Sequence, residues 1–226
     1  MKFGIGLSFY NDVDGLKLLL ASVDGQVDLV LAIDGRYPSF GRGKGLAALS
    51  TDGSREVLQG YDNTLLVDYP ATQVQKRNKY LQLSKRYGLD FLIIMDGDEY
   101  IKNGADWETF RYVAQKRVRL DLSMYRIYDI RYEEQNGWDL GERPRLWYRP
   151  WEIRYDVKHY RWYIKAKNHL DRPVYEGNAG RALIPGLIMK HNRDARPKQR
   201  NQIMDRYEDW LLHEETKQMK RKYNLP

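Results

Sequence analysis

Three observations predict that this chain folds as an α/β protein with a mostly parallel central sheet flanked by helices. Short apolar runs at residues 3–9, 27–33 and 91–95 have the length and composition of strands, and the run at residues 91–95 is typical of a strand that is buried on both faces. Amphipathic helical patterns lie between these runs, as the connections between parallel strands require. Polar residues follow within two positions of the end of each run. This pattern is typical of sheets that bind a ligand at the carboxyl ends of their strands.

The first strand and helix are indicated by residues 3–23. The run at residues 3–9 leads into Asn11 and Asp12, and either side chain is suited to cap the helix that follows. That helix is indicated by apolar residues at helical spacing, namely Val13, Leu16, Leu20 and Val23. The second run ends in Asp34. A strand, a helix and a strand in such a short stretch begin a parallel α/β sheet.

A loop, a third strand and a longer helix are expected next. Residues 38–55 are rich in glycine, serine and basic residues, but their spacing differs from that of a P-loop. Asp52 or Ser54 is expected to cap a short helix. Residues 64–67 are a third candidate strand, and residues 73–87 are predicted to form a helix that ends at a glycine.

The most informative stretch joins the run at residues 91–95 to an acidic cluster of Asp96, Asp98 and Glu99. Alternation along an extended chain would point Asp96 and Asp98 the same way, and Gly97 lets the backbone bend and a ligand approach. Paired carboxylates suit Mg²⁺ or Mn²⁺, which hold phosphate oxygens in turn. An isolated Asp-Gly-Asp is more often an ordinary acidic turn. The convergence of three polar strand ends on one rim favours the metal site.

The second half of the chain has a different composition. A helix is predicted at residues 106–115, and aromatic and basic residues then interleave over residues 124–163, much as in antiparallel strands. Two interpretations remain open for this stretch. Its aromatic faces pack on the core, or they form an acceptor platform that stacks on sugars or bases while arginines hold phosphates.

A last strand and a helix are predicted near the end of the sequence. Residues 183–189 form an apolar run that leads into Lys190 and His191, and residues 197–222 are predicted to be a charged helix. The expected organisation is a single domain over residues 1–226. Residues 1–105 are expected to be the nucleotide-binding half, which the resemblance given below makes a nucleotide-sugar-binding half, and residues 106–226, with the C-terminal helix, are expected to be the acceptor-side half.

Composition narrows the classes of protein. The chain has 226 residues, no cysteine and a net charge of +7. The lack of cysteine excludes disulfides and thiolate zinc sites and fits a cytoplasmic protein. The apolar runs are far too short to span a membrane, so no transmembrane segment is expected. The basic balance is compatible with nucleic acid, an anionic membrane surface or a nucleoside diphosphate as partner.

Several segments together point to a known family. They follow one another along the chain at residues 8–12, 32–35, 76–78, 94–99, 143–147 and 189–191. This ordered set resembles that of glycosyltransferases with the GT-A fold, close to the family 2 type. The resemblance spans nearly the whole chain and is thinnest in the acceptor-side half. It implies a GT-A type, Rossmann-like sheet with an aromatic-rich β region on the acceptor side.

The resemblance also implies an activity and a set of site residues. The activity is transfer of a sugar from a nucleoside-diphosphate sugar, most often a UDP-sugar, to a hydroxyl of a glycan or of a modified nucleic-acid base. The implied nucleotide-sugar-binding residues are Phe9, Asn11, Asp34, Arg36, Arg77, Asp96, Gly97, Lys190 and Arg193. Arg77 is expected to hold either the nucleotide or Asp34. The implied ligands of Mn²⁺ or Mg²⁺ are Asp96, Asp98 and His191.

The catalytic base is less sharply indicated. An inverting reaction needs a carboxylate to take the proton of the acceptor hydroxyl. Asp139 and Glu142 are the candidates, in a turn-like segment before a predicted strand, and Glu133 and Glu134 are also open. A retaining enzyme needs no such base.

Two rival functions use the same features. A non-catalytic nucleic-acid-binding protein would explain the basic, aromatic stretch, and its affinity would fall steeply with salt without needing a divalent metal. A nucleotidyltransferase on the same fold would release pyrophosphate instead of a nucleoside diphosphate. It would be expected to carry a glycine-rich signature after its first strand, which residues 8–13 lack.

Overall fold

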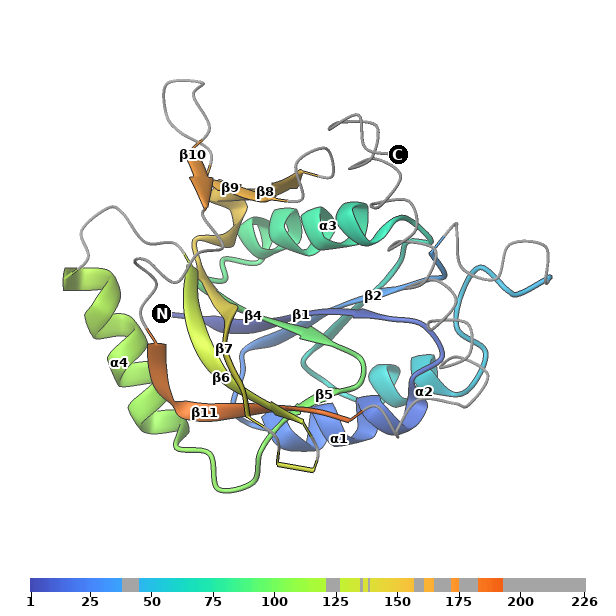
Figure 1. Ribbon diagram of the computed structural model, residues 1–226. Coiled ribbons are helices and arrows are strands. Elements are labelled where there is room, and N and C mark those ends of the chain that lie inside the picture. The colour runs from blue at the N-terminus through green and yellow to red at the C-terminus, as the bar shows by residue number, and fades with distance from the viewer. Residues whose placement is uncertain are drawn as a thin grey trace, which may run out of the picture.

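An eight-stranded sheet forms the centre of the molecule (Figure 1). The structure, a computed structural model, describes residues 1–37, 45–120, 127–134, 136–137, 139–156, 161–164, 172–174 and 183–192. The first half of the sheet is parallel and consists, in spatial order, of β3 (Thr64–Asp68), β2 (Leu29–Asp34), β1 (Phe3–Phe9) and β4 (Phe91–Asp96). The predicted α/β class and the parallel arrangement of the first strands are confirmed.

The second half of the sheet is mixed. Its strands, in spatial order, are β7 (Asp139–Tyr148), β6 (Ile127–Glu134), β11 (Leu183–His191) and β5 (Glu99–Ile101). β7 runs antiparallel to β4 and β6, whereas β11 is parallel to β6 and antiparallel to β5. The antiparallel strands expected in the aromatic stretch are therefore present, and the sheet as a whole is mixed.

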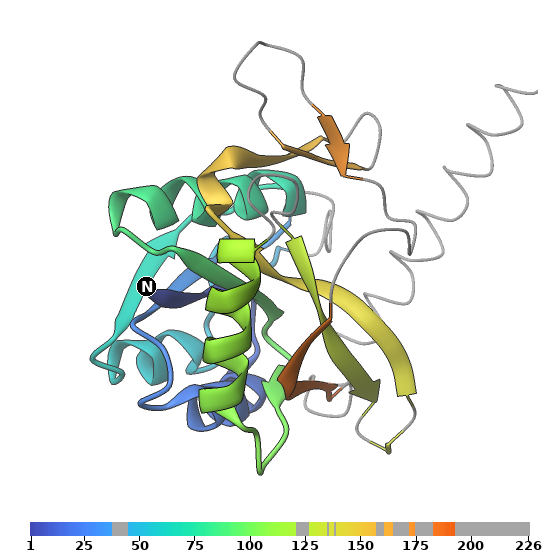
Figure 2. The same ribbon diagram turned by 90° about the vertical axis from the view of Figure 1, so that its left-hand side faces the viewer.

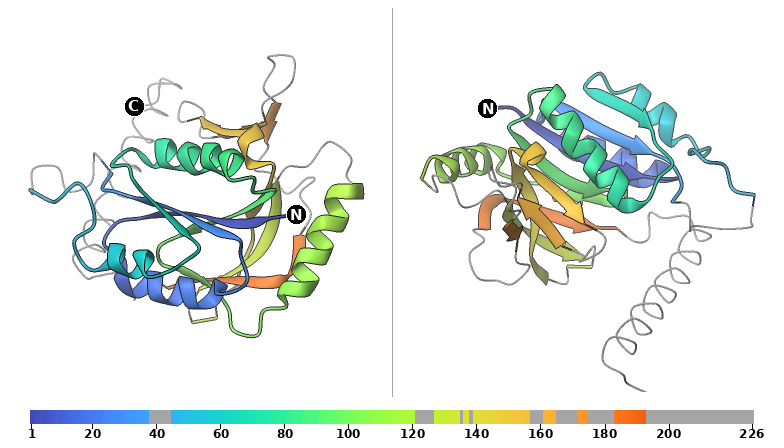
Figure 3. Two further views of the ribbon diagram at one scale, coloured as in Figure 1. Left: turned by 180° about the vertical axis from the view of Figure 1, so that it is seen from behind. Right: turned by 90° about the horizontal axis from the view of Figure 1, so that it is seen from above.

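Helices cover both faces of the sheet (Figures 1 and 3). α1 (Val13–Val23) and α2 (Ser54–Gln59) lie on one face, and α3 (Gln73–Arg86) lies on the other. Right-handed crossovers explain this division, because the chain first moves outward from β1 to β3 and then returns past β1 to β4. The strand order consequently reverses between β1 and β4. In open α/β sheets a ligand site lies outside the carboxyl ends of the strands at such a reversal.

The remaining elements pack around this sheet. α4 (Trp107–Leu120) lies against β11. A short helix, η1 (Pro150–Glu152), leads into a separate antiparallel sheet of β8 (Ile153–Asp156), β9 (Arg161–Ile164) and β10 (Arg172–Val174). Figure 2 shows this small sheet beside α3, against which η1 and β8 pack.

The core explains why these segments are strands. Every residue of β1, and residues 91–95 of β4, are buried, as strands covered on both faces require. Phe3 and Phe91 stack with their ring centroids 4.5 Å apart on these neighbouring strands. Tyr128 of β6 and Trp147 of β7 are also buried. For these two aromatic residues, core packing is the correct interpretation.

The boundaries of α3 agree with the sequence pattern to within one residue, whereas α4 continues to Leu120, beyond the predicted end at residue 115. α3 begins with a capping box, in which the side chains of Thr72 and Gln75 each accept a hydrogen bond from the other residue's backbone amide. Asp12 occupies the N-cap position of α1, but its side chain makes no cap hydrogen bond. The predicted helix at residues 197–222 lies outside the described residues. Within the described part of the chain, no helix is long and apolar enough to cross a membrane.

Candidate functional site

The polar residues that follow the first strands lie along one rim of the sheet. In the strand register, Ser8 of β1 pairs with Asp96 of β4, and Phe9 pairs with Asp34 of β2. Asp34 in turn pairs with Asp68 of β3. The predicted convergence of these strand ends is therefore confirmed. The Asp96 end of the row lies at the reversal of strand order, where a ligand is expected.

His191 reaches the acidic turn from the far end of the described chain. Its Nε2 atom lies 2.7 Å from Oδ2 of Asp98, and the backbone amide of Asn192 donates to the carbonyl of Asp98 at 2.8 Å. β11 brings these residues in, because it pairs with β5 so that His191 lies opposite Glu99. Two of the three predicted metal ligands are thus in direct contact.

The donor atoms at this place fit a small divalent cation by type. Asp96 and Asp98 supply carboxylate oxygens, which suit both Mn²⁺ and Mg²⁺, and His191 supplies an imidazole nitrogen, which suits a transition metal such as Mn²⁺ better than Mg²⁺. Asp98 is almost completely buried, whereas the Asp96 side chain is 33% exposed. Within the described residues, no three His, Asp or Glu side chains already converge as a metal cage. The role of all three as metal ligands stays a prediction.

Gly97 is required by the packing of α1 against the acidic turn. A β-carbon on Gly97 would come within 2.5 Å of Oδ2 of Asp12, and a β-carbon on Gly15 would overlap the carbonyl oxygen of Gly97. The space beside Gly97 is therefore filled by Asp12 from this side. The predicted approach of a ligand to Gly97 stays untested.

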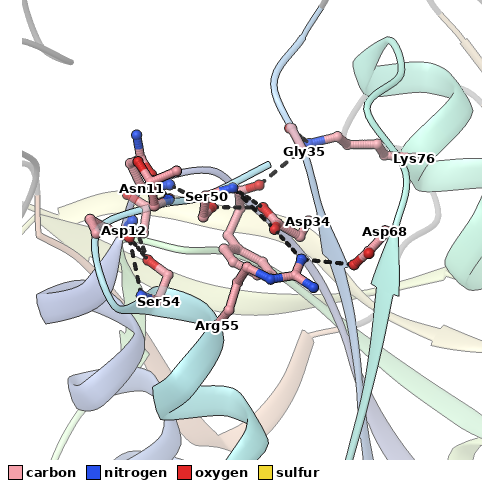
Figure 4. A network of polar contacts seen from close by, with 12 residues as sticks. Asn11, Asp12, Asp34, Gly35, Ser50, Ser54, Arg55, Asp68 and Lys76 are labelled. Atoms are coloured by element: carbon pink, nitrogen blue, oxygen red, sulfur yellow. Dashed lines mark hydrogen bonds and ion pairs between the residues drawn. The ribbon is translucent and has the colours of Figure 1, made fainter. Parts of the chain in front are cut away.

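Asp34 is buried and held by its own chain (Figure 4). Its carboxylate accepts a hydrogen bond from Oγ of Ser50 at 2.6 Å and lies 2.6 Å from Nη1 of Arg55. The same nitrogen of Arg55 lies 2.7 Å from Asp68. Arg55 is thus a cation that pairs with Asp34, whereas the sequence suggested Arg77 either for that role or for holding the nucleotide. Sequence reasoning missed Arg55 because an arginine in the first turn of a short helix is usually solvated.

Residues 50–54 also hold the end of β1 (Figure 4). The backbone amide of Asn11 donates to Oγ of Ser50, and Oδ1 of Asn11 accepts from the backbone amide of Thr51, both at 2.9 Å. Asn11 has a φ of +53°, a conformation that asparagine tolerates better than most residues. The amide of Asp12 donates to Oγ of Ser54 at 2.8 Å. One segment therefore fixes the ends of both β1 and β2.

Two other predicted nucleotide-binding residues lie near these strand ends. Phe9 is buried in the core at the end of β1. Arg36 is half-buried, and its backbone amide donates to the carbonyl of Ala48 at 2.8 Å. This bond brings the two ends of the long loop after β2 together.

Lys76 is a fully buried cation that sequence reasoning did not assign to the site. Its Nζ donates to the carbonyl of Gly35 and lies 3.4 Å from the carbonyl of Phe9, so it joins the ends of β2 and β1. It also lies 4.5 Å from the centre of the Tyr37 ring. Burial lowers the pKa of Lys76 to about 8, although the charges of Asp34 and Asp96 oppose this. Lysine is so rarely buried that no sequence pattern indicates such a position.

Two arginines interact electrostatically with Asp96. The guanidinium of Arg145 contacts Oε1 of Glu99 and lies 4.0 Å from Oδ2 of Asp96. Arg77 of α3 lies within the electrostatic reach of Asp96 and Arg145; burial lowers its pKa, but Tyr80 and Asp96 raise it above the usual value overall. Burial raises the pKa of Glu99 to about 7, with Arg145 opposing the shift and Asp96 adding to it. The acidic turn therefore interacts with the positive charges of Arg145 and Arg77.

Of the remaining predicted residues, the described structure brings Glu134 to His191 and turns Lys190 away from it. Lys190 lies on the opposite face of β11 from His191, where its Nζ is 3.2 Å from Oε2 of Glu133. Glu134 lies beside His191, at 3.5 Å from Nδ1. Asp139 and Glu142 are in β7, and their side chains are outside the described part. Arg193 also lies outside it.

Comparisons with known proteins gave structural neighbours alone. No family model and no curated protein matched the chain. The crystal structure of Staphylococcus aureus TarS 1–349 is 18% identical with a TM-score of 0.46, covering 66% of this chain and 47% of that chain. TarS 1–349 in complex with UDP-GlcNAc is 21% identical with a TM-score of 0.43, covering 61% and 36%. A cytidylyltransferase from Leptospira borgpetersenii is 14% identical with a TM-score of 0.36, covering 66% and 61%.

The matched part of this chain spans less than half of each of the TarS chains. Independently of these comparisons, the topology agrees with the GT-A type, Rossmann-like fold that the sequence resemblance implies. Helices cover both faces of a central sheet whose parallel half ends in the acidic turn.

Proposed function

We propose that this protein is a glycosyltransferase that moves a sugar from a nucleoside-diphosphate sugar, most simply a UDP-sugar, to a hydroxyl acceptor. One observation carries the proposal. Asp98 and His191 are in contact, 2.7 Å apart, next to Asp96 at the reversal of strand order in the sheet. A carboxylate and an imidazole at that point suit a donor whose diphosphate is bound with a divalent cation.

The proposed roles follow from the residues around the turn. Asp98 and His191 would hold Mn²⁺ or Mg²⁺, with Asp96 beside them as a further ligand or as a contact to the ribose. When bound, the cation neutralises negative charge on the departing diphosphate. Arg77 and Arg145 add positive charge around Asp96, which favours an anionic ligand in the same place.

The end of β2 has a proposed role in holding the nucleotide. Asp34 is fully buried and is bonded to Ser50 and Arg55. Its main structural role is therefore to fix residues 50–55 against the ends of β1 and β2. A direct contact between Asp34 and the base or ribose, as the resemblance implies, would require one of these bonds to be exchanged. Asn11 and Arg36 remain proposed contacts beside it.

The acceptor side is proposed from β7 and the residues around it. Asp139 and Glu142 remain the candidates for the base that takes the proton of the acceptor hydroxyl. A glycan and a modified nucleic-acid base are both acceptors with the required hydroxyl. Lys190 is ion-paired with Glu133, so we favour a structural role for this lysine over the nucleotide contact predicted from the sequence.

The direct test is thermal unfolding with a panel of nucleoside diphosphates and their sugars, with and without Mn²⁺. A ligand that binds only the folded state raises Tm by mass action. At a free ligand concentration of a hundred times Kd, the free energy of unfolding rises by about 2.7 kcal/mol. We expect one nucleotide to raise Tm in the presence of metal and Asp98→Ala to abolish that rise. Asp14→Ala, which removes an exposed carboxylate from α1, is the matched control and should respond like the wild type.

The same samples separate the rival functions. A folded wild-type protein that responds to no nucleotide would contradict the proposal. Release of pyrophosphate in place of a nucleoside diphosphate would identify a nucleotidyltransferase. Metal-independent binding of DNA or RNA that weakens steeply with salt, without a nucleotide response, would identify a nucleic-acid-binding protein.

A further inference from the structure

We propose that Arg145, Glu99 and Tyr132 form a positioning unit that fixes the carboxylate of Asp96 for the bound donor. This inference rests on the proposed function and adds to it three residues that act through Asp96. None of the three needs to touch the donor. They come from β7, β5 and β6, three strands that meet around the acidic turn.

Glu99 closes the turn from within. Its Oε2 atom accepts a hydrogen bond from the backbone amide of Asp96 at 2.8 Å, so a side chain spans the turn that Asp96, Gly97 and Asp98 form. Its Oε1 atom accepts from the hydroxyl of Tyr132 at 2.6 Å. Both carboxylate oxygens are therefore engaged, and the residue is 1% exposed. Glu99 is in consequence a support for the turn rather than an accessible ligand.

Arg145 connects this support to Asp96. One guanidinium nitrogen, Nη2, contacts Oε1 of Glu99, while Nη1 lies 4.0 Å from Oδ2 of Asp96 and 3.5 Å from the carbonyl of Ile94. The guanidinium also lies over the ring of Tyr132, 5.3 Å from its centre. A planar guanidinium can satisfy several partners in a fixed geometry, which the flexible ammonium of lysine cannot do.

Exposure increases along this chain of contacts toward the solvent. The side chains of Glu99, Arg145 and Asp96 are 2%, 17% and 33% exposed, respectively. Asp96 is thus the accessible end of a network whose other members are covered. In this proposal, Glu99 and Arg145, which packing holds in place, set the orientation of the Asp96 carboxylate. Supporting residues of this kind preorganise a binding site.

Stability alone is a poor explanation for this arrangement. A buried ion pair costs about as much to desolvate as its attraction returns, and apolar residues of similar volume often stabilise a fold as well or better. Asp96 and Glu99 are moreover two acids beside one turn, and Arg145 lies between them. Arg145 offsets the repulsion between the two carboxylates and orients Asp96, the more exposed of them. This positioning is a function that the ion pair can serve at the site.

The test is the affinity of the protein for UDP with Mn²⁺, measured by calorimetry for Arg145→Lys and Tyr132→Phe. Partners that orient a metal-binding or ligand-binding group typically contribute about ten- to a hundredfold in affinity. We expect a loss in that range for Arg145→Lys and a smaller loss for Tyr132→Phe. Arg143→Lys, on the same strand and exposed, should bind like the wild type.

Hydrogen exchange separates positioning from a merely structural role. The amide of Asp96 should exchange faster in Arg145→Lys without ligand, while the free energy of unfolding measured in urea stays near that of the wild type. If the wild type binds UDP but Arg145→Lys keeps the same affinity and the same amide exchange, this inference alone is overturned. It is also overturned if the variant loses affinity only in proportion to its loss of stability. A wild type that binds no nucleotide would overturn the proposed function, and this inference with it.

Discussion

Arg55 forms ion pairs with two aspartates that differ in their exposure to water. Its Nη1 atom lies 2.6 Å from Asp34, whose side chain is fully buried, and 2.7 Å from Asp68, whose side chain is 53% exposed. An exposed ion pair contributes little, because water and salt screen it. A buried carboxylate that loses its cation, by contrast, keeps its desolvation cost without compensation.

Removal of Arg55 should therefore cost far more stability than removal of Asp68. We expect Arg55→Met to lower the free energy of unfolding by about 3 kcal/mol, since the bonds from Ser50 to Asp34 remain. We expect Asp68→Ala to lower it by less than about 1 kcal/mol. Urea unfolding of both variants measures the two values, and equal costs would contradict the buried pairing.

Lys76 makes stability depend on pH in the alkaline range. Its pKa is about 8 in the folded protein and 10.5 in the unfolded chain, so the unfolded chain binds the proton more tightly between these values. Stability rises with pH wherever the unfolded state binds more protons. Relative to Lys76→Met, the wild type should therefore gain up to about 1.4 kcal/mol per pH unit between about pH 8 and 10.5, and nothing below that range.

The comparison of variants separates the contribution of Lys76 to the pH dependence of stability from the contributions of other groups. Lys79→Met, three residues further along α3 and only partly buried, is the matched control. It should keep the slope of the wild type. A Lys76→Met protein whose stability follows that of the wild type across this range would show that Lys76 is not the source of the slope.

At the scale of elements, the contact between α1 and the acidic turn depends on two glycines. Gly15 of α1 lies against the carbonyl of Gly97, and Asp12 fills the space where a β-carbon on Gly97 would lie. The helix and the turn approach so closely that neither glycine has room for a side chain. The geometry of the candidate metal ligands therefore depends on how α1 packs.

Gly97→Ala should lower the free energy of unfolding by about 1–3 kcal/mol, the usual cost of overpacking a filled core. The added methyl group would meet the carboxylate of Asp12 at 2.5 Å. In an Asp12→Ala background the same substitution should cost less, and thermal unfolding of the four proteins of this double-mutant cycle measures the difference. Gly60→Ala, at the exposed end of α2 with no neighbour closer than 3.6 Å, is the control. Independent, additive effects would rule out the steric contact.

At the scale of the whole molecule, the first hundred residues could be predicted well from sequence. Their apolar runs and helical spacings are local patterns, and the strands, helices and shared rim they predict are present. The family resemblance implies that Asp98 and His191 are ligands of one metal ion, and they lie in contact, but their role as ligands stays a prediction. The organisation as one domain with two functional halves, 1–105 and 106–226, stays a prediction.

The rest could not be predicted because it depends on contacts between distant segments. Arg55 and Lys76 look like ordinary solvated residues of helices until the ends of β1 and β2 are placed against them. Asp12 looks like a helix cap until Gly97 is beside it. Lys190 follows the same apolar run as His191, yet alternation along β11 turns it to the other face.

The position of β11 also sets the order in which the protein can be completed. This strand lies between β6 and β5, and in the described sheet β5 has no other neighbour. Contacts between segments so far apart in the chain form late, since a long loop must close before they yield any energy. During synthesis, Asp98 therefore leaves the ribosome long before its partner His191. The chain can build its parallel strands early, but the pair proposed to bind the metal cannot form until residues 183–191 have been made and inserted.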